Sequence, residues 1–183
     1  MDTVELFHRT LADYGLSDAI AAGVAWYPDA LEMCNYKAYR YSLSTARVAA
    51  LVAVTSPRAR WSTNISAVES ILEDSRRPLS ARRAHYGILG ANAAKGARIV
   101  SEWDYNYLIT GPKVTAFYRA ILGDSNSVTV DAIMSRAAGY GASVTVKIRR
   151  TVEAATREVA HDLGLSPRDA QAAIWVAYRG SAA

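Results

Sequence analysis

YLITGPKVTAFYRAILGDSNSVTVDAIMSR, residues 107–136, is the stretch that decides the fold of this 183-residue chain. Its apolar residues recur at the spacing of one helical face: Val114, Phe117, Tyr118, Ile121 and Leu122. The turn Thr110-Gly111-Pro112 precedes this helix, and Gly123 follows its last apolar residue as an expected helix end. We therefore predict a helical hairpin over residues 102–123.

The segment after the hairpin, residues 124–138, combines a polar loop with the start of another helix. That helix is expected to run from Asp131 to about Ala138, because glycines follow it closely. The tetrapeptide Ser-Val-Thr-Val occurs at 127–130 and again at 143–146. Four residues are too few to decide whether these two copies form short strands.

Helical signals also prevail outside this stretch. The chain has 34 alanines against 5 prolines and 11 glycines, which favours an all-α protein over an all-β one. Apolar spacing predicts helices over 3–14 and 152–163, and Ser166-Pro167 is typical of a helix start. A helix that Ser17 or Asp18 caps is expected to end or kink before Pro28.

The middle of the chain contains further short helices. One begins at Ser42 or Ser44 and ends at Thr55, and the turn SPRARWSTN at 56–64 leads into the next. The later helices are predicted from four segments: 65–77, from Ser80 to Leu89, 93–100, and the first hairpin arm at 102–108. Together these signals predict about ten short helices in a single domain spanning residues 1–183.

The composition excludes several classes of protein. One cysteine, Cys34, rules out a disulfide scaffold and a cysteine-ligated cluster within one chain. The three histidines have no metal-like spacing, so no metal and no cofactor is expected. No apolar run approaches the roughly 18 residues of a membrane span, and the start MDTVELFHRT lacks a basic signal-peptide region. We therefore expect a cytoplasmic protein without a membrane partner.

The net charge of +4 is distributed unevenly. Residues 1–36 hold one base and six acids, residues 37–119 hold thirteen bases and five acids, and residues 120–183 hold seven bases and six acids. A central segment with a net charge of +8 is either a solvated face or the footprint of a polyanion such as nucleic acid.

Three residues of the hairpin and the following segment are candidates for chemistry. The N–H groups at the helix start after Gly111 lack partners within the helix and suit a phosphate. Lys113, in the same turn, is either a surface lysine that contacts phosphate or a nucleophile activated by desolvation. Asp131 is either an N-cap or a carboxylate at the mouth of a cleft, where it stabilises a developing cation or acts as a base.

These residues resemble a known family. The pattern resembles the helix-hairpin-helix base-excision DNA glycosylase superfamily, which includes endonuclease III. The hairpin glycine, lysine, aspartate and arginine of that family correspond in relative position to Gly111, Lys113, Asp131 and Arg136. Upstream, GILGANAAKGARIV at 87–100 resembles a family helix, with Asn92 and Lys95 at its polar positions. The resemblance covers roughly residues 45–140. Without the cysteine cluster, it points to the cluster-free, small phage or actinobacterial members.

The resemblance implies a compact multi-helix glycosylase-like fold and an enzyme that acts on duplex DNA as a monomer. Such an enzyme flips a damaged or modified base out of the duplex and cleaves its N-glycosidic bond. The resemblance implies that Asp131 is the catalytic carboxylate and that water or Lys113 is the nucleophile. If Lys113 is the nucleophile, a Schiff base forms and strand scission follows. The DNA-binding residues that the resemblance implies are Gly111, Arg58, Arg60, Trp61, Asn64, Lys95, Arg119 and Arg136.

Within this set, Arg58 or Asn64 is expected to fill the gap left by the flipped base. Trp61 either stacks on a base or anchors its loop in the core. Arg119 and Arg136 either contact phosphate or pair with a carboxylate. The spacing from Asp131 to Arg136 argues against a direct ion pair between those two.

Departures from the family pattern keep other functions open. Ile109 stands where the first hairpin glycine is usual, and Ala132-Ile133 stands where Thr-His often follows the aspartate. One alternative is a non-catalytic helix-hairpin-helix module that only binds DNA. Another is a phage enzyme that modifies bases through the same base-flipping pocket, and a third is a structural helical protein.

Overall fold

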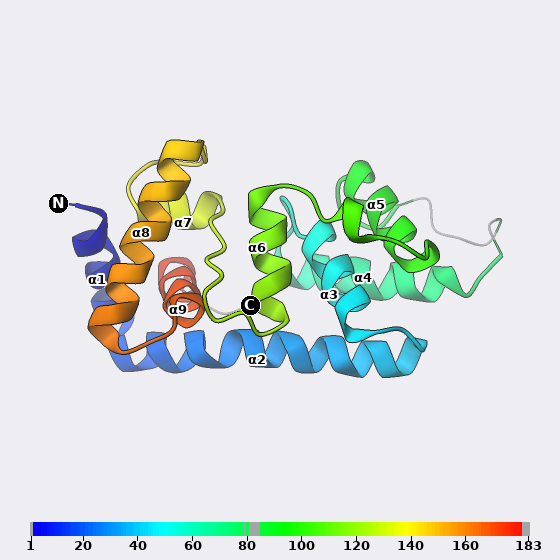
Figure 1. Ribbon diagram of the computed structural model, residues 1–183, viewed down its shortest axis with the longest axis horizontal. Coiled ribbons are helices and arrows are strands. Elements are labelled where there is room, and N and C mark those ends of the chain that lie inside the picture. The colour runs from blue at the N-terminus through cyan, green and yellow to red at the C-terminus, as the bar shows by residue number, and fades with distance from the viewer. Residues whose placement is uncertain (1, 79, 81–84, 181–183) are drawn as a thin grey trace. The chain divides into compact units, whose positions relative to one another are not determined.

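In a computed structural model of the chain, residues 2–78, 80 and 85–180 are described (Figure 1). Every regular element in these ranges is a helix and none is a strand, which confirms the all-α prediction. Both Ser-Val-Thr-Val segments therefore lack strand structure. Within the described ranges, no helix combines the length and the apolar character that crossing a bilayer would require.

The chain divides into two compact units. Among the described residues, unit 1 comprises those of 2–30 and 119–180, and unit 2 comprises those of 31–118. Helix α2 (Leu16–Tyr41) and helix α6 (Pro112–Ile121) each contribute residues to both units.

Among its described residues, unit 1 contains four helices besides its shares of α2 and α6. These are α1 (Thr3–Tyr14), α7 (Ala132–Ala137), α8 (Val146–Leu163) and α9 (Pro167–Arg179). Helices α1, α8 and α9 pack against one another around fully buried side chains that include Phe7, Val152 and Ile174. The predicted caps form: Ser166 accepts a hydrogen bond from the N–H of Asp169, and Gly164 ends α8 in the left-handed conformation.

Unit 2 is built around α3 (Thr45–Thr55), whose last eight residues, 48–55, are all buried. Its other described elements include α4 (Trp61–Ser75), α5 (Gly90–Ser101) and the 3₁₀ turn η2 (Asn106–Leu108). Helix α5 approaches α3 and α4 closely at Gly96, where an added Cβ would lie 2.9 Å from Leu51 Cδ1 and 3.0 Å from Ile71 Cδ1. Burial of α3 on all sides agrees with its nearly continuous apolar sequence.

We predict an end or a kink of the second helix before Pro28, and the predicted end does not occur. Helix α2 begins at Leu16, ahead of both predicted caps, and continues through Pro28 for 26 residues (Figure 1). A proline inside a helix removes one hydrogen bond at a cost of about 3 kcal/mol. Pro28 itself is exposed, while Tyr27 and Ala30 beside it are buried. Burial of these neighbours along the helix offsets the cost.

The first arm of the predicted hairpin also differs from expectation. A helix over 102–108 was predicted, whereas only Asn106–Leu108 form a 3₁₀ turn. The guanidinium of Arg47 donates hydrogen bonds to the carbonyl oxygens of Ile99, Val100, Glu102 and Trp103. These bonds occupy carbonyls at the end of α5 and hold the chain that follows in an irregular conformation. The second arm, α6, forms as predicted.

The helix predicted from Ser80 to Leu89 does not reach its predicted end. Ser80 has 3₁₀ structure, residues 85–89 are irregular, and residues 81–84 lie outside the described part of the chain. Helix α5 instead begins at Gly90, earlier than the predicted 93.

The contact between α2 and α9 in unit 1 makes a testable prediction about Gly23. An added Cβ there would lie 2.5 Å from the backbone nitrogen of Ala173, which cannot yield as a side chain can. Although alanine is the better helix former, we expect Gly23→Ala to lower the free energy of unfolding by about 1–3 kcal/mol through overpacking. Chemical denaturation measures the change.

Gly90→Ala is the matched control, because nothing lies within 4 Å of a Cβ at Gly90, in the first turn of α5. It is expected to leave stability unchanged or raise it by up to about 1 kcal/mol. Equal effects of the two substitutions would contradict the close packing of α2 on α9.

Candidate functional site

In unit 2, side-chain hydrogen bonds tie three segments that are distant in sequence. Asn92 Nδ2 on α5 donates to the Pro57 carbonyl at 3.2 Å, and Lys95 Nζ donates to Thr110 Oγ1 at 3.1 Å. Lys113 Nζ donates to Ser56 Oγ at 2.5 Å. The loop after α3, the start of α5 and the hairpin turn therefore form one surface. We call residues 56–60, 92–95 and 109–113 the hairpin surface.

The hairpin surface has a uniform charge. It contains no acidic residue and four basic residues, which are Arg58, Arg60, Lys95 and Lys113. Arg58 and Arg60 are exposed, whereas Lys95 and Lys113 are partly buried. Four positive charges without an acid among them give a strongly positive local potential, which attracts a polyanion.

The backbone of the hairpin turn adds to this potential. Gly111 is exposed, adopts a φ of 87°, and has no atom within 4 Å of the position of a Cβ. A left-handed residue at this turn favours glycine, and an open space beside it allows close approach of another molecule. The positive end of the α6 dipole lies at the same turn and favours an anion.

Lys113 is anchored within unit 2. Besides its bond to Ser56, its ammonium group lies 5.4 Å from the centre of the Phe117 ring, one turn further along α6. Ser56 in turn donates to the carbonyl oxygen of Ala53 near the end of α3. The lysine expected from the resemblance is thus positioned by the loop that carries Arg58.

Asn64 and Trp61 do not lie on a loop. Both belong to α4, which begins at Trp61, so the prediction of a turn extending to residue 64 is wrong. Asn64 is 1% exposed, and its amide donates to the Val52 carbonyl at 3.1 Å. A buried amide that joins α4 to α3 is not available to fill a gap in DNA, whereas Arg58 remains exposed. Trp61 is partly buried in the first turn of α4.

In unit 1, the carboxylate of Asp131 accepts three hydrogen bonds. Its Oδ1 accepts from the backbone N–H groups of Ile133 at 2.9 Å and Met134 at 3.0 Å, which makes Asp131 the N-cap of α7. Its Oδ2 accepts from the indole Nε1–H of Trp175 on α9 at 3.2 Å. The N-cap interpretation is therefore confirmed, and it leaves the second carboxylate oxygen facing an aromatic side chain.

Aromatic and polar side chains surround this carboxylate. The rings of Trp26 and Trp175 are 6.2 Å apart and tilted by 58°. Tyr27, which is buried beside them, donates to Gln171 Oε1 at 2.7 Å and lies 3.2 Å from Thr129 Oγ1. Burial raises the pKa of Tyr27 above its usual value, and the negative charge of Asp131 contributes in the same direction.

The two remaining candidate arginines are exposed. Arg136 lies on α7, and none of the three bonds to Asp131 comes from it, in agreement with the expected lack of an ion pair. Arg119 lies near Asp124, whose pKa is lowered by the Ser127 hydroxyl, by the Asn126 N–H and by the charges of Arg119 and Arg157.

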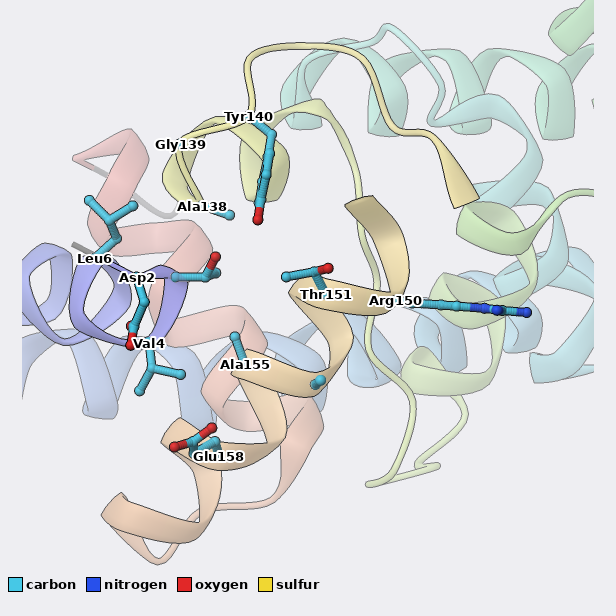
Figure 2. Close-up of a pocket in the computed structure, with 12 residues that line it drawn as sticks. Asp2, Val4, Leu6, Ala138, Gly139, Tyr140, Arg150, Thr151, Ala155 and Glu158 are labelled. Atoms are coloured by element: carbon cyan, nitrogen blue, oxygen red, sulfur yellow. The ribbon is translucent and has the colours of Figure 1, made fainter. Parts of the chain in front are cut away.

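Unit 1 also has an open groove away from these residues (Figure 2). It measures about 770 Å³ and is lined by the start of α1, the turn after α7 and the middle of α8. Tyr140, Thr151 and Ala155 face it, whereas the Arg150 side chain extends away from the others in this view. Its lining includes none of the candidate site residues.

The structure thus groups the candidates into two sets. Arg58, Arg60, Lys95, Gly111 and Lys113 share the hairpin surface of unit 2, whereas Asp131, Arg119 and Arg136 belong to unit 1. Sequence reasoning missed Trp175, because Gln171, Trp175 and Tyr178 recur at i, i+4 and i+7, a spacing typical of the packed face of a helix. Among the described residues, no group of three or more His, Cys, Asp or Glu residues is placed to hold a metal ion.

Comparison with known protein families identifies the family of this chain. A model described as a family of unknown function (DUF7178) matches residues 12–182. The chain belongs to this family. The match covers both units, including the hairpin surface and Asp131. No curated protein and no solved structure matches the chain.

Proposed function

We propose that this DUF7178 protein is a DNA glycosylase-like enzyme that binds duplex DNA and excises a damaged or modified base. The observation that carries the proposal is the hairpin surface, which combines four basic residues and no acidic residue with an open glycine turn at the start of α6. We also propose that the fold is glycosylase-like, with η2, the Gly111 turn and α6 as the helix-hairpin-helix. We propose further that the enzyme is a monomer.

The hairpin surface matches the chemistry of a DNA backbone. DNA phosphates are singly charged and regularly spaced, and they are the same whatever the nucleotide sequence. A patch of exposed Lys and Arg side chains binds them and releases the counterions of the DNA. Arg58 and Arg60 are the exposed bases of the patch, while the hydrogen bonds of Asn92, Lys95 and Lys113 hold its segments in place. A preorganised surface of this kind binds without first having to order its loops.

Asp131 supplies the chemistry that excision requires. Cleavage of an N-glycosidic bond develops positive charge on the sugar, and a fixed carboxylate stabilises that charge electrostatically. A carboxylate has about four lone-pair positions, of which the three N–H donors occupy three. The remaining position is on Oδ2, where it is available to the sugar or to an attacking water.

Lys113 provides a second route for the same reaction. With water as the nucleophile the product is an abasic site, whereas attack by the Lys113 amine at C1′ of the sugar expels the base and leads to a Schiff base. The contact with Ser56 and the Phe117 ring fixes the amine in one place. Lys113 and Asp131 belong to different units, and we test their roles separately.

A second function, that of a non-catalytic DNA-binding module, is favoured by one observation. Asp131 caps α7 and Lys113 is bonded to Ser56, so each residue also has a structural role that needs no reaction. Both functions use the hairpin surface. Excision distinguishes them.

Binding to DNA is tested first with Arg58→Gln. We expect a severalfold higher Kd for duplex DNA, with the slope of log K against log salt reduced in magnitude by about 0.9 for the lost phosphate contact. Arg9→Gln is the control, because Arg9 is also exposed but lies in the acidic N-terminal part of the chain. Fluorescence anisotropy at several salt concentrations measures both quantities, and equal effects of the two variants would refute the assigned surface.

Excision is tested with a panel of duplexes that carry different damaged or modified bases. We expect the wild type to excise at least one base and Asp131→Asn to be slower by about 100-fold or more, the order of magnitude of a preorganised electrostatic contact. Asparagine retains an N-cap acceptor, so α7 should persist. If Asp131→Asn excised the base as fast as the wild type, the catalytic role assigned to Asp131 would be overturned. No product from any duplex would favour the binding module.

The nucleophile is identified by borohydride trapping on a substrate that the wild type excises. If Lys113 attacks, the wild type forms a covalent complex with DNA, and Lys113→Ala does not. Lys95→Ala is the matched control, because Lys95 is another partly buried lysine on the hairpin surface. Equal trapping by wild type and Lys113→Ala would exclude the lyase role and leave water as the nucleophile.

A further inference from the structure

We propose that Trp175 is a positioning residue for Asp131, which orients the carboxylate so that the free position on Oδ2 faces the reacting sugar. This inference rests on the proposed function, because it assigns a role within the same excision reaction. It adds a residue from the C-terminal helix α9, 44 positions beyond Asp131, to the site.

The geometry of the cap leaves a specific role for this contact. An N-cap aspartate needs only one oxygen to satisfy the first N–H groups of its helix, and Oδ1 of Asp131 does so with two bonds. The second oxygen of such a residue is commonly left to solvent. Here Oδ2 accepts the Trp175 indole N–H at 3.2 Å, which fixes the plane of the carboxylate as well as its position.

The indole is itself held in place on several sides. The Trp26 ring packs at 6.2 Å, and the guanidinium of Arg179 lies 4.6 Å from the centre of the Trp175 ring. Ile174 and Val176, on either side of Trp175 along α9, are completely buried. A donor on so constrained a ring keeps the acceptor oriented without reorganisation during the reaction, which is the condition for electrostatic preorganisation.

The role makes a prediction that simple packing does not. Trp175→Phe keeps an aromatic ring beside Trp26 and Arg179 but removes the N–H donor. We expect single-turnover excision to slow by about tenfold through loss of orientation, while the Kd for DNA stays within about twofold of the wild type. Trp103→Phe is the control: Trp103 is 96% exposed and donates none of the three bonds to Asp131, so its rate should match the wild type.

A second readout does not depend on activity. Asp131→Ser keeps a capping hydroxyl for α7 but has no second oxygen to accept the indole N–H. Hydrogen exchange of the tryptophan indole groups, followed by NMR, should then accelerate at Trp175 and remain unchanged at Trp103, which is 96% exposed and lies in unit 2. Unchanged exchange at Trp175 would overturn the contact.

The outcomes separate this inference from the proposed function. Excision by the wild type with an unchanged rate in Trp175→Phe would overturn the positioning role alone. A slowed Trp175→Phe whose Kd for DNA also rises severalfold would overturn it as well, because a general loss of packing would then explain the slower rate. No excision by the wild type would overturn the proposed function, and the positioning role with it, whatever the exchange data show.

Discussion

Three N–H groups converge on the carboxylate of Asp131, and the proposed chemistry depends on that convergence. Two of them belong to the first turn of α7 and the third to α9, so one side chain joins the end of the polar segment 124–130 to the C-terminal helix. Capping accounts for the two backbone bonds. The indole bond leaves one acceptor position on Oδ2, and a fixed charge with one open position is what stabilisation of a developing cation requires.

The hairpin surface and the Asp131 carboxylate lie in different units. Unit 2 contains the hairpin surface, whose segments are held by contacts that all lie inside that unit. Unit 1 contains Asp131 together with Trp175, Trp26 and Tyr27. DNA affinity and the orientation of the carboxylate are therefore separable properties, and substitutions in one unit should change one without the other.

Local patterns predicted the helices whose ends carry strong signals. Ser44, Ser166 and Gly164 mark helix ends as expected, because a side-chain acceptor or a left-handed glycine acts on its own backbone neighbourhood. The errors arose where a distant contact decides the conformation. Arg47 holds the chain after α5 at Glu102 and Trp103, 55 and 56 residues away, and no local rule anticipates this.

The same distinction applies to the site. The spacing of Gly111, Lys113 and Asp131 could be read from the sequence, and so could the choice between an N-cap and a reactive carboxylate. The burial of Asn64 could not, since it follows from the packing of α4 on α3. Trp175 was hidden for a related reason: its helical spacing indicated packing, and only the fold brings its N–H to Asp131.

The most direct measurement is a crystal structure of Asp131→Asn bound to duplex DNA that carries a base the wild type excises. The account predicts that one nucleotide is rotated out of the duplex with its C1′ beside residue 131. DNA bound elsewhere, or bound with every base still stacked in the duplex, would contradict it.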